Sequence, residues 1–379
     1  MDGLPIARIA GLEIRVSLTW VFLLAIVTVL GAQAAAAASD ALAPPIEWMI
    51  GGATAFAFLA TVIAHELAHA LVARSHGLAV TTLVIGFLGG TTPFDLQGRT
   101  AREEIEIGLA GPLLSLALGA VLVVSSGMLD GDGIAGALSG GVLVVGVLNL
   151  VLGGLSLLPA MPLDGGRLVR AVSWAHSGDP RRGSRASALI GRVTGWVLIA
   201  AGAALALAIG PAEGLMVMSL GWLVTTGAGA VERRLALETL LEGVVVRDAM
   251  ERDVPRVPPH LTLDTFADRF AGTRNDPGAT TIPVVDGERV VGVIAADRVR
   301  RLGRRRWATT RADEVMADLS RVPILDAGAA LWDGLESLRR AGLDGLPVTD
   351  GPVFEGVLTR RSATNLIRER MRHQAGSAA

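Results

Sequence analysis

The sequence contains no cysteine and no lysine, and charged residues of both signs make up only 18% of its 379 residues. The absence of cysteine excludes disulfides and all zinc sites with thiolate ligands, so a transition-metal site must use histidine and carboxylate side chains. We interpret the absence of lysine as a coding bias. Hydrophobic residues reach 51% and mean hydropathy is +0.51, values that favour a membrane protein, whereas the net charge of −2 indicates no particular partner.

Several apolar stretches have about the 20 residues that a helix needs to cross a bilayer. They lie near residues 16–38, 49–73, 104–126, 136–158, 190–209 and 211–231. The sequence therefore predicts a polytopic α-helical membrane protein with six transmembrane helices and both termini on one side.

The arginines indicate which side that is. They gather in the N-terminal tail and the second-to-third connection (Arg8, Arg15, Arg74, Arg99, Arg102), around the fourth-to-fifth connection (Arg167, Arg170, Arg181, Arg182, Arg185, Arg192) and after the last span (Arg233, Arg234). Positively charged residues are enriched in cytoplasmic loops, so both termini are predicted to be cytoplasmic.

From about Leu237 the sequence reads as soluble and repeats itself. "TIPVVDGERVVGVIAADRVRRL" (281–302) recurs as "GLPVTDGPVFEGVLTRRSATNLI" (345–367), and each unit predicts a strand, a helix, a hairpin turning at Asp-Gly and a further helix. We predict a transmembrane domain over 1–236, repeats over 237–305 and 306–371, and a flexible tail over 372–379. The basic stretch 300–311 is interpreted as a solvated or headgroup-facing linker rather than a nucleic-acid site.

The stretch "VIAHELAHALVARSHG" (62–77) places ionisable side chains inside the second apolar run. On a helix, His65 and His69 share one face at a spacing that suits one tetrahedral metal, and Glu66 lies at the flank as a general base. The alternative is that these polar groups are satisfied by neighbouring helices; their cost in lipid favours a functional role. His76 lies about 16 Å further along the axis, too far to share the metal.

A third ligand must come from another histidine or carboxylate. Asp164 is the best candidate, since it lies in "LLPAMPLDGGRLVRA" (157–171), where prolines interrupt the helix and Gly165-Gly166 permits close backbone approach. The alternative is that Asp164 caps the next short helix. Asp95 is predicted to lie in a loop, and Glu103, Glu104 and Glu106 at the edge of a span, which makes them weaker candidates.

The motifs "HELAH" and "PAMPLDGGR" together resemble the site-2 protease family of intramembrane zinc metalloproteases, in particular its bacterial branch with C-terminal tandem CBS domains. The start "IAGLEIRVSLTWVFLL" resembles how that branch opens. "FLGGTTPF" (87–94) stands where the family has a re-entrant β-element. The resemblance covers essentially the whole chain and implies about six transmembrane helices with this β-element, followed by a cytoplasmic α+β tandem CBS module.

The resemblance also implies an activity and a site. It implies one Zn²⁺ held by His65, His69 and Asp164, with Glu66 as the catalytic base. The family cleaves transmembrane segments of substrate proteins, often single-span regulatory proteins such as anti-sigma factors, and the resemblance therefore also implies a bacterial inner-membrane location. An extended substrate is expected to pair with the strand edge of "VIGFLGG" (84–90).

Two features depart from the family pattern. Ser156 stands where the family has an asparagine thought to hold the substrate or the oxyanion, and Asn149 on the same span is a substitute candidate. In the CBS repeats, the position of the ribose-binding aspartate falls on Arg298, beside Asp297, and on Ser362. An adenine nucleotide ligand and a structural, homodimerising role therefore both stay open.

Two other functions deserve comparison with the protease. A CBS-gated transporter would need polar residues along several spans, whereas here the intramembrane ionisable residues concentrate at His65, Glu66, His69 and Asp164. A protease-like protein that binds membrane partners without cutting them is favoured only by Ser156.

Overall fold

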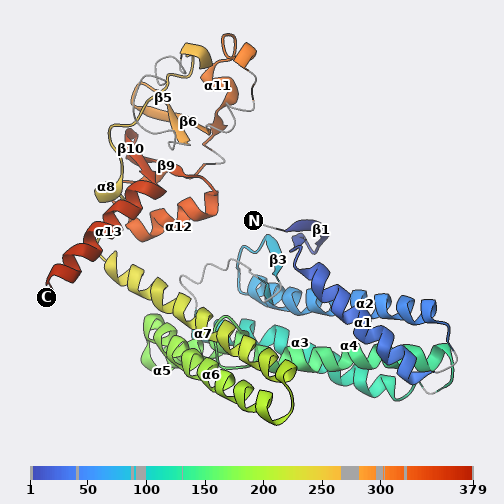
Figure 1. The fold of residues 1–379 in the computed structure, drawn as a ribbon. Helices are drawn as coiled ribbons and strands as arrows, with labels where there is room; N and C mark the ends of the chain where they lie inside the picture. The colour runs from blue at the N-terminus through green and yellow to red at the C-terminus, as the bar shows by residue number, and fades with distance from the viewer. Residues whose placement is uncertain are drawn as a thin grey trace. The chain divides into compact units, whose positions relative to one another are not determined.

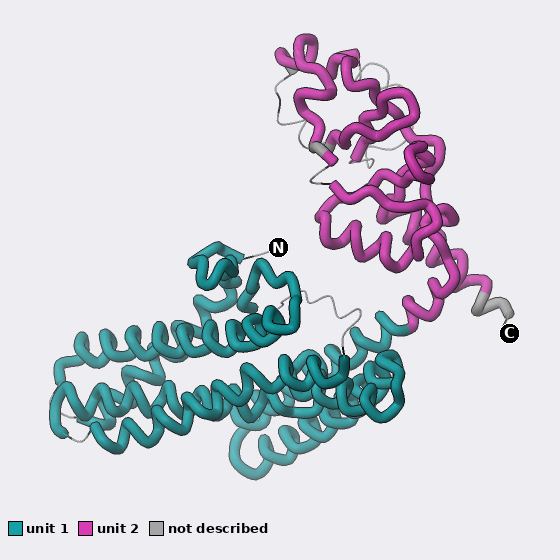
Figure 2. Tube along the Cα trace, turned by 180° about the vertical axis from the view of Figure 1, so that it is seen from behind, with its two compact units in different colours: residues 1–235 teal, residues 236–379 magenta. Residues whose placement is uncertain are grey.

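The computed structural model describes residues 3–39, 42–86, 89–90, 100–129, 131–265, 281–295, 302, 304–319 and 322–377. The chain forms two compact units, residues 1–235 and 236–379, which Figure 2 shows in different colours. Each unit has its own hydrophobic clusters and is described separately.

Within the described residues, six helices are long and apolar enough to cross a membrane, which confirms the number predicted from the sequence. They are α1 (Trp20–Ala38), α2 (Pro44–Ser75), α3 (Ala101–Ser126), α4 (Ile134–Ser156), α6 (Pro180–Ala208) and α7 (Pro211–Leu240), as Figure 1 labels them. All belong to the first unit except the last residues of α7. A shorter helix, α5 (Asp164–Ser177), connects α4 to α6.

The boundaries of α6 differ from those predicted. The helix begins at Pro180, which occupies its first turn after the N-cap residue Asp179, whereas the apolar run begins at residue 190. The first turns carry Arg181, Arg182 and Arg185, so a search for apolar residues alone does not register them as helix. Proline at this position suits a helix start, because the first N–H groups have no helical acceptor.

Small residues let the membrane helices approach closely. A Cβ at Gly51 of α2 would lie 2.3 Å from the Thr28 carbonyl oxygen of α1, and a Cβ at Gly31 of α1 would lie 2.8 Å from the Thr54 side chain of α2. Glycine at such crossings brings two backbones into van der Waals contact, which stabilises helix association in lipid.

A four-stranded sheet, in the order β1-β2-β3-β4, stands beside the helices. Its strands are β1 (Leu4–Ile9), β2 (Leu12–Val16), β3 (Thr82–Gly86) and β4 (Gly89–Gly90). Strand β2 pairs in parallel with β3, and Leu12 and Ile14 are fully buried. The sequence reading did not identify β1 and β2, although alternating Leu12 and Ile14 are a strand signal.

Arg74 ties this sheet to the end of α2. Its guanidinium donates to the carbonyl oxygens of Ala10 and Gly11, in the β1–β2 turn, and of Val80, just before β3. Strand β3 therefore starts at a fixed place relative to the histidine-bearing helix. Of the segment 87–94, proposed from the sequence as a re-entrant element, only Gly89 and Gly90 are described, and they form β4.

The second unit contains the two hairpins predicted from the repeats. Strands β5 (Thr281–Asp286) and β6 (Arg289–Ala295) pair antiparallel, as do β9 (Gly345–Asp350) and β10 (Val353–Thr359). Both hairpins turn at an Asp-Gly pair whose glycine has positive φ, 62° at Gly287 and 57° at Gly351. Such turns favour glycine because an L side chain is strained there.

The remaining elements of the second unit complete two small sheets, β10-β9-β8 and β5-β6-β7. They are α8 (Val246–Ala249), η1 (Arg304–Arg306), α11 (Ala312–Val315), β7 (Ala317–Asp318), β8 (Leu325–Asp326), α12 (Leu331–Ala341) and α13 (Arg360–Ser377). Buried apolar side chains form one cluster mainly against the sheet β10-β9-β8 and another against β5 and β6, so the internal repeat has a structural counterpart.

The α1–α2 crossing gives a matched pair of substitutions. Gly51→Ala places a methyl group against the α1 backbone, so we expect a loss of about 1–3 kcal/mol of stability from overpacking. Gly52→Ala is the control, because a Cβ there meets nothing within 4 Å. Thermal unfolding in detergent should show a lower midpoint for Gly51→Ala only; equal midpoints would contradict the crossing.

Candidate metal centre

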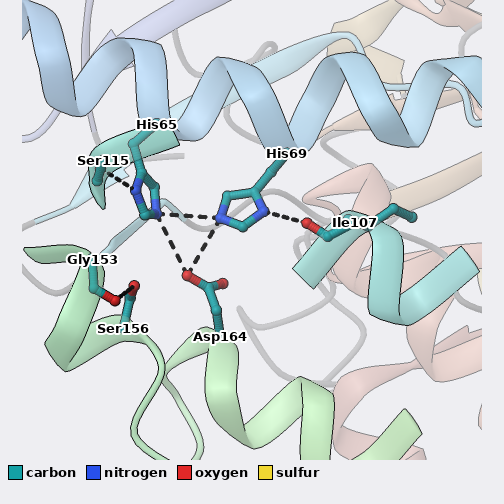
Figure 3. Close-up of polar contacts among 7 residues, drawn as sticks. All are labelled: His65, His69, Ile107, Ser115, Gly153, Ser156 and Asp164. Carbon is teal, nitrogen blue, oxygen red and sulfur yellow. Dashed lines mark hydrogen bonds and ion pairs between the residues drawn. The ribbon is translucent and has the colours of Figure 1, made fainter. Parts of the chain in front are cut away.

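Three side chains from two helices converge inside the first unit. Nε2 of His65 and Nε2 of His69, both on α2, lie 3.2 Å apart, and Oδ2 of Asp164 lies 3.5 Å and 3.3 Å from them (Figure 3). The histidines are buried one turn apart on the same face of α2, and Asp164 is the first residue of α5. The sequence-predicted set of His65, His69 and Asp164 is therefore brought together.

The spacing of the three atoms fits zinc. Three ligands of a tetrahedral Zn²⁺ at about 2.0–2.1 Å from the metal stand about 3.3–3.4 Å from one another. Two imidazole nitrogens and one carboxylate oxygen are also ligands that zinc accepts, and this chain offers no thiolate. Both the donor set and its dimensions therefore suit this metal.

Helix α3 orients both imidazole rings through contacts with their Nδ1 atoms. His69 Nδ1 lies 2.6 Å from the Ile107 carbonyl oxygen, and His65 Nδ1 lies 2.8 Å from Ser115 Oγ. A carbonyl oxygen can only accept, so the His69 Nδ1–H donates and the Nε2 of the neutral ring carries its lone pair toward Asp164. A hydrogen bond of this kind fixes the tautomer and the orientation of a metal-binding histidine.

Gly111 of α3 leaves the space between the rings open. A Cβ at this position would lie 2.3 Å from His69 Nε2 and 2.6 Å from His65 Nε2. The atoms that would meet a side chain here are the same two that face Asp164. A glycine is therefore required for these nitrogens to be accessible to a metal.

The start of α5 sets the position of Asp164. Leu163, not Asp164, is the N-cap residue, and no side-chain capping bond is made, so the alternative role as a helix cap is not observed. The helix N-terminus favours a negative charge at this place. Gly165 and Gly166 lie against the backbone of residues 157–161, where a Cβ would come within 2.2–2.3 Å of backbone atoms, so the close approach expected of this pair is present.

Glu66 and His76 occupy different environments along α2. Glu66, beside His65, is buried with 7% of its surface exposed. His76 is the C-cap residue, followed by Gly77 at positive φ, and its Nε2 contacts Glu106 Oε2 at 2.9 Å. His76 is therefore engaged at the helix end, as its distance along the helix predicts.

The two candidates for substrate binding both make contacts within the protein. Asn149 Nδ2 donates to Thr61 Oγ1 at 2.9 Å and to the Val145 carbonyl oxygen at 2.8 Å, which bridges α4 to α2. Ser156 Oγ donates to the Gly153 carbonyl oxygen at 3.0 Å (Figure 3). A single hydroxyl has one hydrogen to donate, so Ser156 must rotate before it can bind another acceptor.

The supporting residues of α3 were not predicted from the sequence. Ile107, Gly111 and Ser115 follow one another at intervals of four, which places them on one face of the helix. The available signal was this spacing of small and polar residues within an apolar run. The spacing alone does not identify these residues as supports of the histidines, because it does not show that α3 packs against α2.

The candidates for nucleotide recognition fall in the second unit. Asp297 and Arg298 lie outside the described residues. Ser362 exchanges hydrogen bonds with Thr359: its N–H donates to Thr359 Oγ1 at 3.0 Å, and the Thr359 N–H donates to its Oγ at 3.1 Å. Ser362 thus forms a capping box at the start of α13.

Gly111 provides a test of the centre that does not depend on activity. We expect Gly111→Ala to abolish stoichiometric zinc binding, because the added methyl group occupies the space between the two imidazoles. Gly154→Ala on α4 is the matched control, since a Cβ there meets nothing within 4 Å. Zinc content measured by mass spectrometry after dialysis should fall only in the first variant, and full occupancy in Gly111→Ala would refute this geometry.

Known proteins resemble both units. The model of "Peptidase family M50" matches residues 53–145, which include the two histidines, and the CBS domain model matches residues 246–304. Rip3 of Mycobacterium tuberculosis is 31% identical over 374 residues, covering 97% of this chain and 93% of the relative. "Zinc metalloprotease MJ0392" of Methanocaldococcus jannaschii is 27% identical, covering 81% of this chain and 82% of the relative.

Among solved structures, the site-2 protease from Methanocaldococcus jannaschii is 24% identical and covers 60% of this chain and 94% of that chain, with a TM-score of 0.42. The family assignment rests on the relatives that match nearly the full length. The chain therefore belongs to peptidase family M50, the site-2 protease family of membrane zinc metalloproteases, and carries a C-terminal CBS domain.

Proposed function

We propose that the protein hydrolyses peptide bonds within transmembrane segments of single-span regulatory proteins, such as anti-sigma factors. The observation that carries this proposal is the convergence of His65, His69 and Asp164 on a zinc-sized space, with Glu66 buried beside them. The two histidines of the centre lie on α2, a helix long and apolar enough to span a membrane, so its substrate is expected to lie in the membrane too.

Each residue has a distinct role in this proposal. His65, His69 and Asp164 hold Zn²⁺, which when bound polarises a peptide carbonyl and acidifies water. Glu66 takes the proton from the attacking water and passes it to the leaving amine nitrogen. The Ile107 carbonyl and Ser115 keep the histidine rings in place while this proton moves.

The sheet beside α2 suggests how a substrate is presented. Helical amides are already hydrogen-bonded, so a transmembrane helix must unwind locally before cleavage. An extended segment can then pair with a strand edge, and β3–β4 forms one end of the sheet β1-β2-β3-β4. We therefore assign substrate pairing to this end, whose strand β3 is positioned relative to α2 through Arg74.

The location and the role of the second unit are also part of the proposal. The arginine distribution supports a cytoplasmic position for both termini and the CBS module, and the resemblance to bacterial relatives favours the inner membrane. The CBS module would act as a regulatory or homodimerising unit, with an adenine nucleotide as its candidate ligand. Ser362 supports a structural role for the module, because it completes a capping box with Thr359 at the start of α13.

Family membership argues against the transporter alternative. The Glu66→Gln variant of the chain, purified in detergent, distinguishes a protease from a protein that binds membrane partners without cutting them. We expect this variant to keep its zinc, because no ligand is removed, and to lose cleavage of a model transmembrane substrate by about 10²–10⁴-fold. Asp164→Asn should lose zinc and activity together.

The controls for this experiment use the same preparation. Gly154→Ala should match the wild type in both zinc content and cleavage. Zinc-loaded wild-type protein that does not cleave, or cleaves as fast as Glu66→Gln, would favour the binding protein over the protease.

Ser156→Ala tests whether the hydroxyl binds the oxyanion. Loss of a dedicated oxyanion donor costs about 10²–10³-fold in kcat. We expect a smaller loss here, because the Ser156 hydrogen is engaged by the Gly153 carbonyl. A loss as large as that of a dedicated donor, measured as kcat with KM unchanged, would assign Ser156 this role.

A further inference from the structure

A charged pair lies buried between the first turn of α3 and the middle of α5. The Glu104 side chain is fully buried (0% exposed), and its Oε1 lies 3.2 Å from Nη1 of Arg170, whose side chain is 16% exposed. A buried carboxylate or guanidinium is tolerated only where it is paired. The pair therefore fixes one point of contact between these two helices.

Helix α5 connects this contact to the metal centre, because it carries both Arg170 and Asp164. Arg170 follows Asp164 by six residues, about 9 Å along the helix axis. Between them, Leu168 packs on α3, where its Cδ2 lies 3.1 Å from the place of a Cβ at Gly108. A short helix held against α3 at Gly108 and at Glu104 has little freedom left for its first residue, Asp164.

The face of α3 that supports the histidines also carries Glu104. Glu104, Ile107, Gly111 and Ser115 succeed one another by three or four residues and so form one stripe. Ile107 and Ser115 hold the two rings, and Gly111 leaves room between them. Glu104 is the member of the stripe that binds the helix of the third ligand.

We propose that Glu104 and Arg170 form a positioning pair that sets the place of the Asp164 carboxylate relative to His65 and His69. The pair acts on the Asp164 carboxylate through α5, because Arg170 lies six residues from Asp164 on that helix. The inference rests on the proposed role of Asp164 as a metal ligand and extends it to residues outside the zinc-binding and protease motifs.

The test separates positioning from stability. Arg170→Met removes the guanidinium that lies 3.2 Å from the buried Glu104 carboxylate, so this variant should be less stable and should bind Zn²⁺ about 10–100-fold more weakly. The double variant Glu104→Gln/Arg170→Met removes both charges, and we expect its unfolding midpoint without metal to recover while its zinc affinity stays weak. Affinity is measured on the full chain by competition with a chromophoric chelator, using Zn²⁺ alone as the probe.

Arg192→Met is the matched control, because Arg192 pairs with Glu232 between α6 and α7. It should leave zinc affinity unchanged. The positioning role is overturned if zinc affinity is unchanged in both Arg170 variants. It is also overturned if zinc affinity recovers together with stability in the double variant. The proposed centre and this inference fail together if the wild-type protein binds no zinc, or if Asp164→Asn binds zinc as well as the wild type does. The inference alone fails if Asp164→Asn loses zinc while Arg170→Met binds it normally.

Discussion

Helix α3 contacts the ring of each histidine and the helix that carries Asp164, and the geometry of the metal centre depends on these contacts. His65 and His69 have a fixed spacing because they share one helix, but their ring orientations do not follow from that spacing. The Ile107 carbonyl and Ser115 supply the orientation, and Gly111 keeps the intervening space free. In a membrane such polar groups are costly unless they are paired, so the scaffold of the site also stabilises it.

Local patterns predicted those parts of the structure that depend on neighbouring residues in the chain. Apolar runs gave the six long helices, Asp-Gly pairs gave the turns of both hairpins, and the spacing of His65 and His69 gave two donor atoms on one face. The association of Asp164 with these histidines was predicted from the proline-interrupted helix and the glycine pair around it and was also implied by the resemblance to a family; the structure brings the three side chains together.

Features that arise from packing between distant segments were missed. Strands β1 and β2 are short and precede the first apolar run, and β2 becomes a central strand only by pairing with β3, about 70 residues later. Glu104 reads as one of several acids at a helix start, and its full burial and its contact with Arg170 distinguish it from Glu103. The basic first turns of α6 were also not predicted, because the start of this helix is set by its N-cap residue and not by a run of apolar residues.

The central claim is that two histidines and one carboxylate hold a tetrahedral zinc ion in a membrane helix bundle. X-ray absorption at the zinc K-edge on the purified full-length protein tests it directly. We expect a nitrogen and oxygen shell at about 2.0–2.1 Å with the outer-shell scattering of two imidazoles, reduced to that of one imidazole in His69→Ala. A six-coordinate oxygen shell without imidazole scattering would contradict the account.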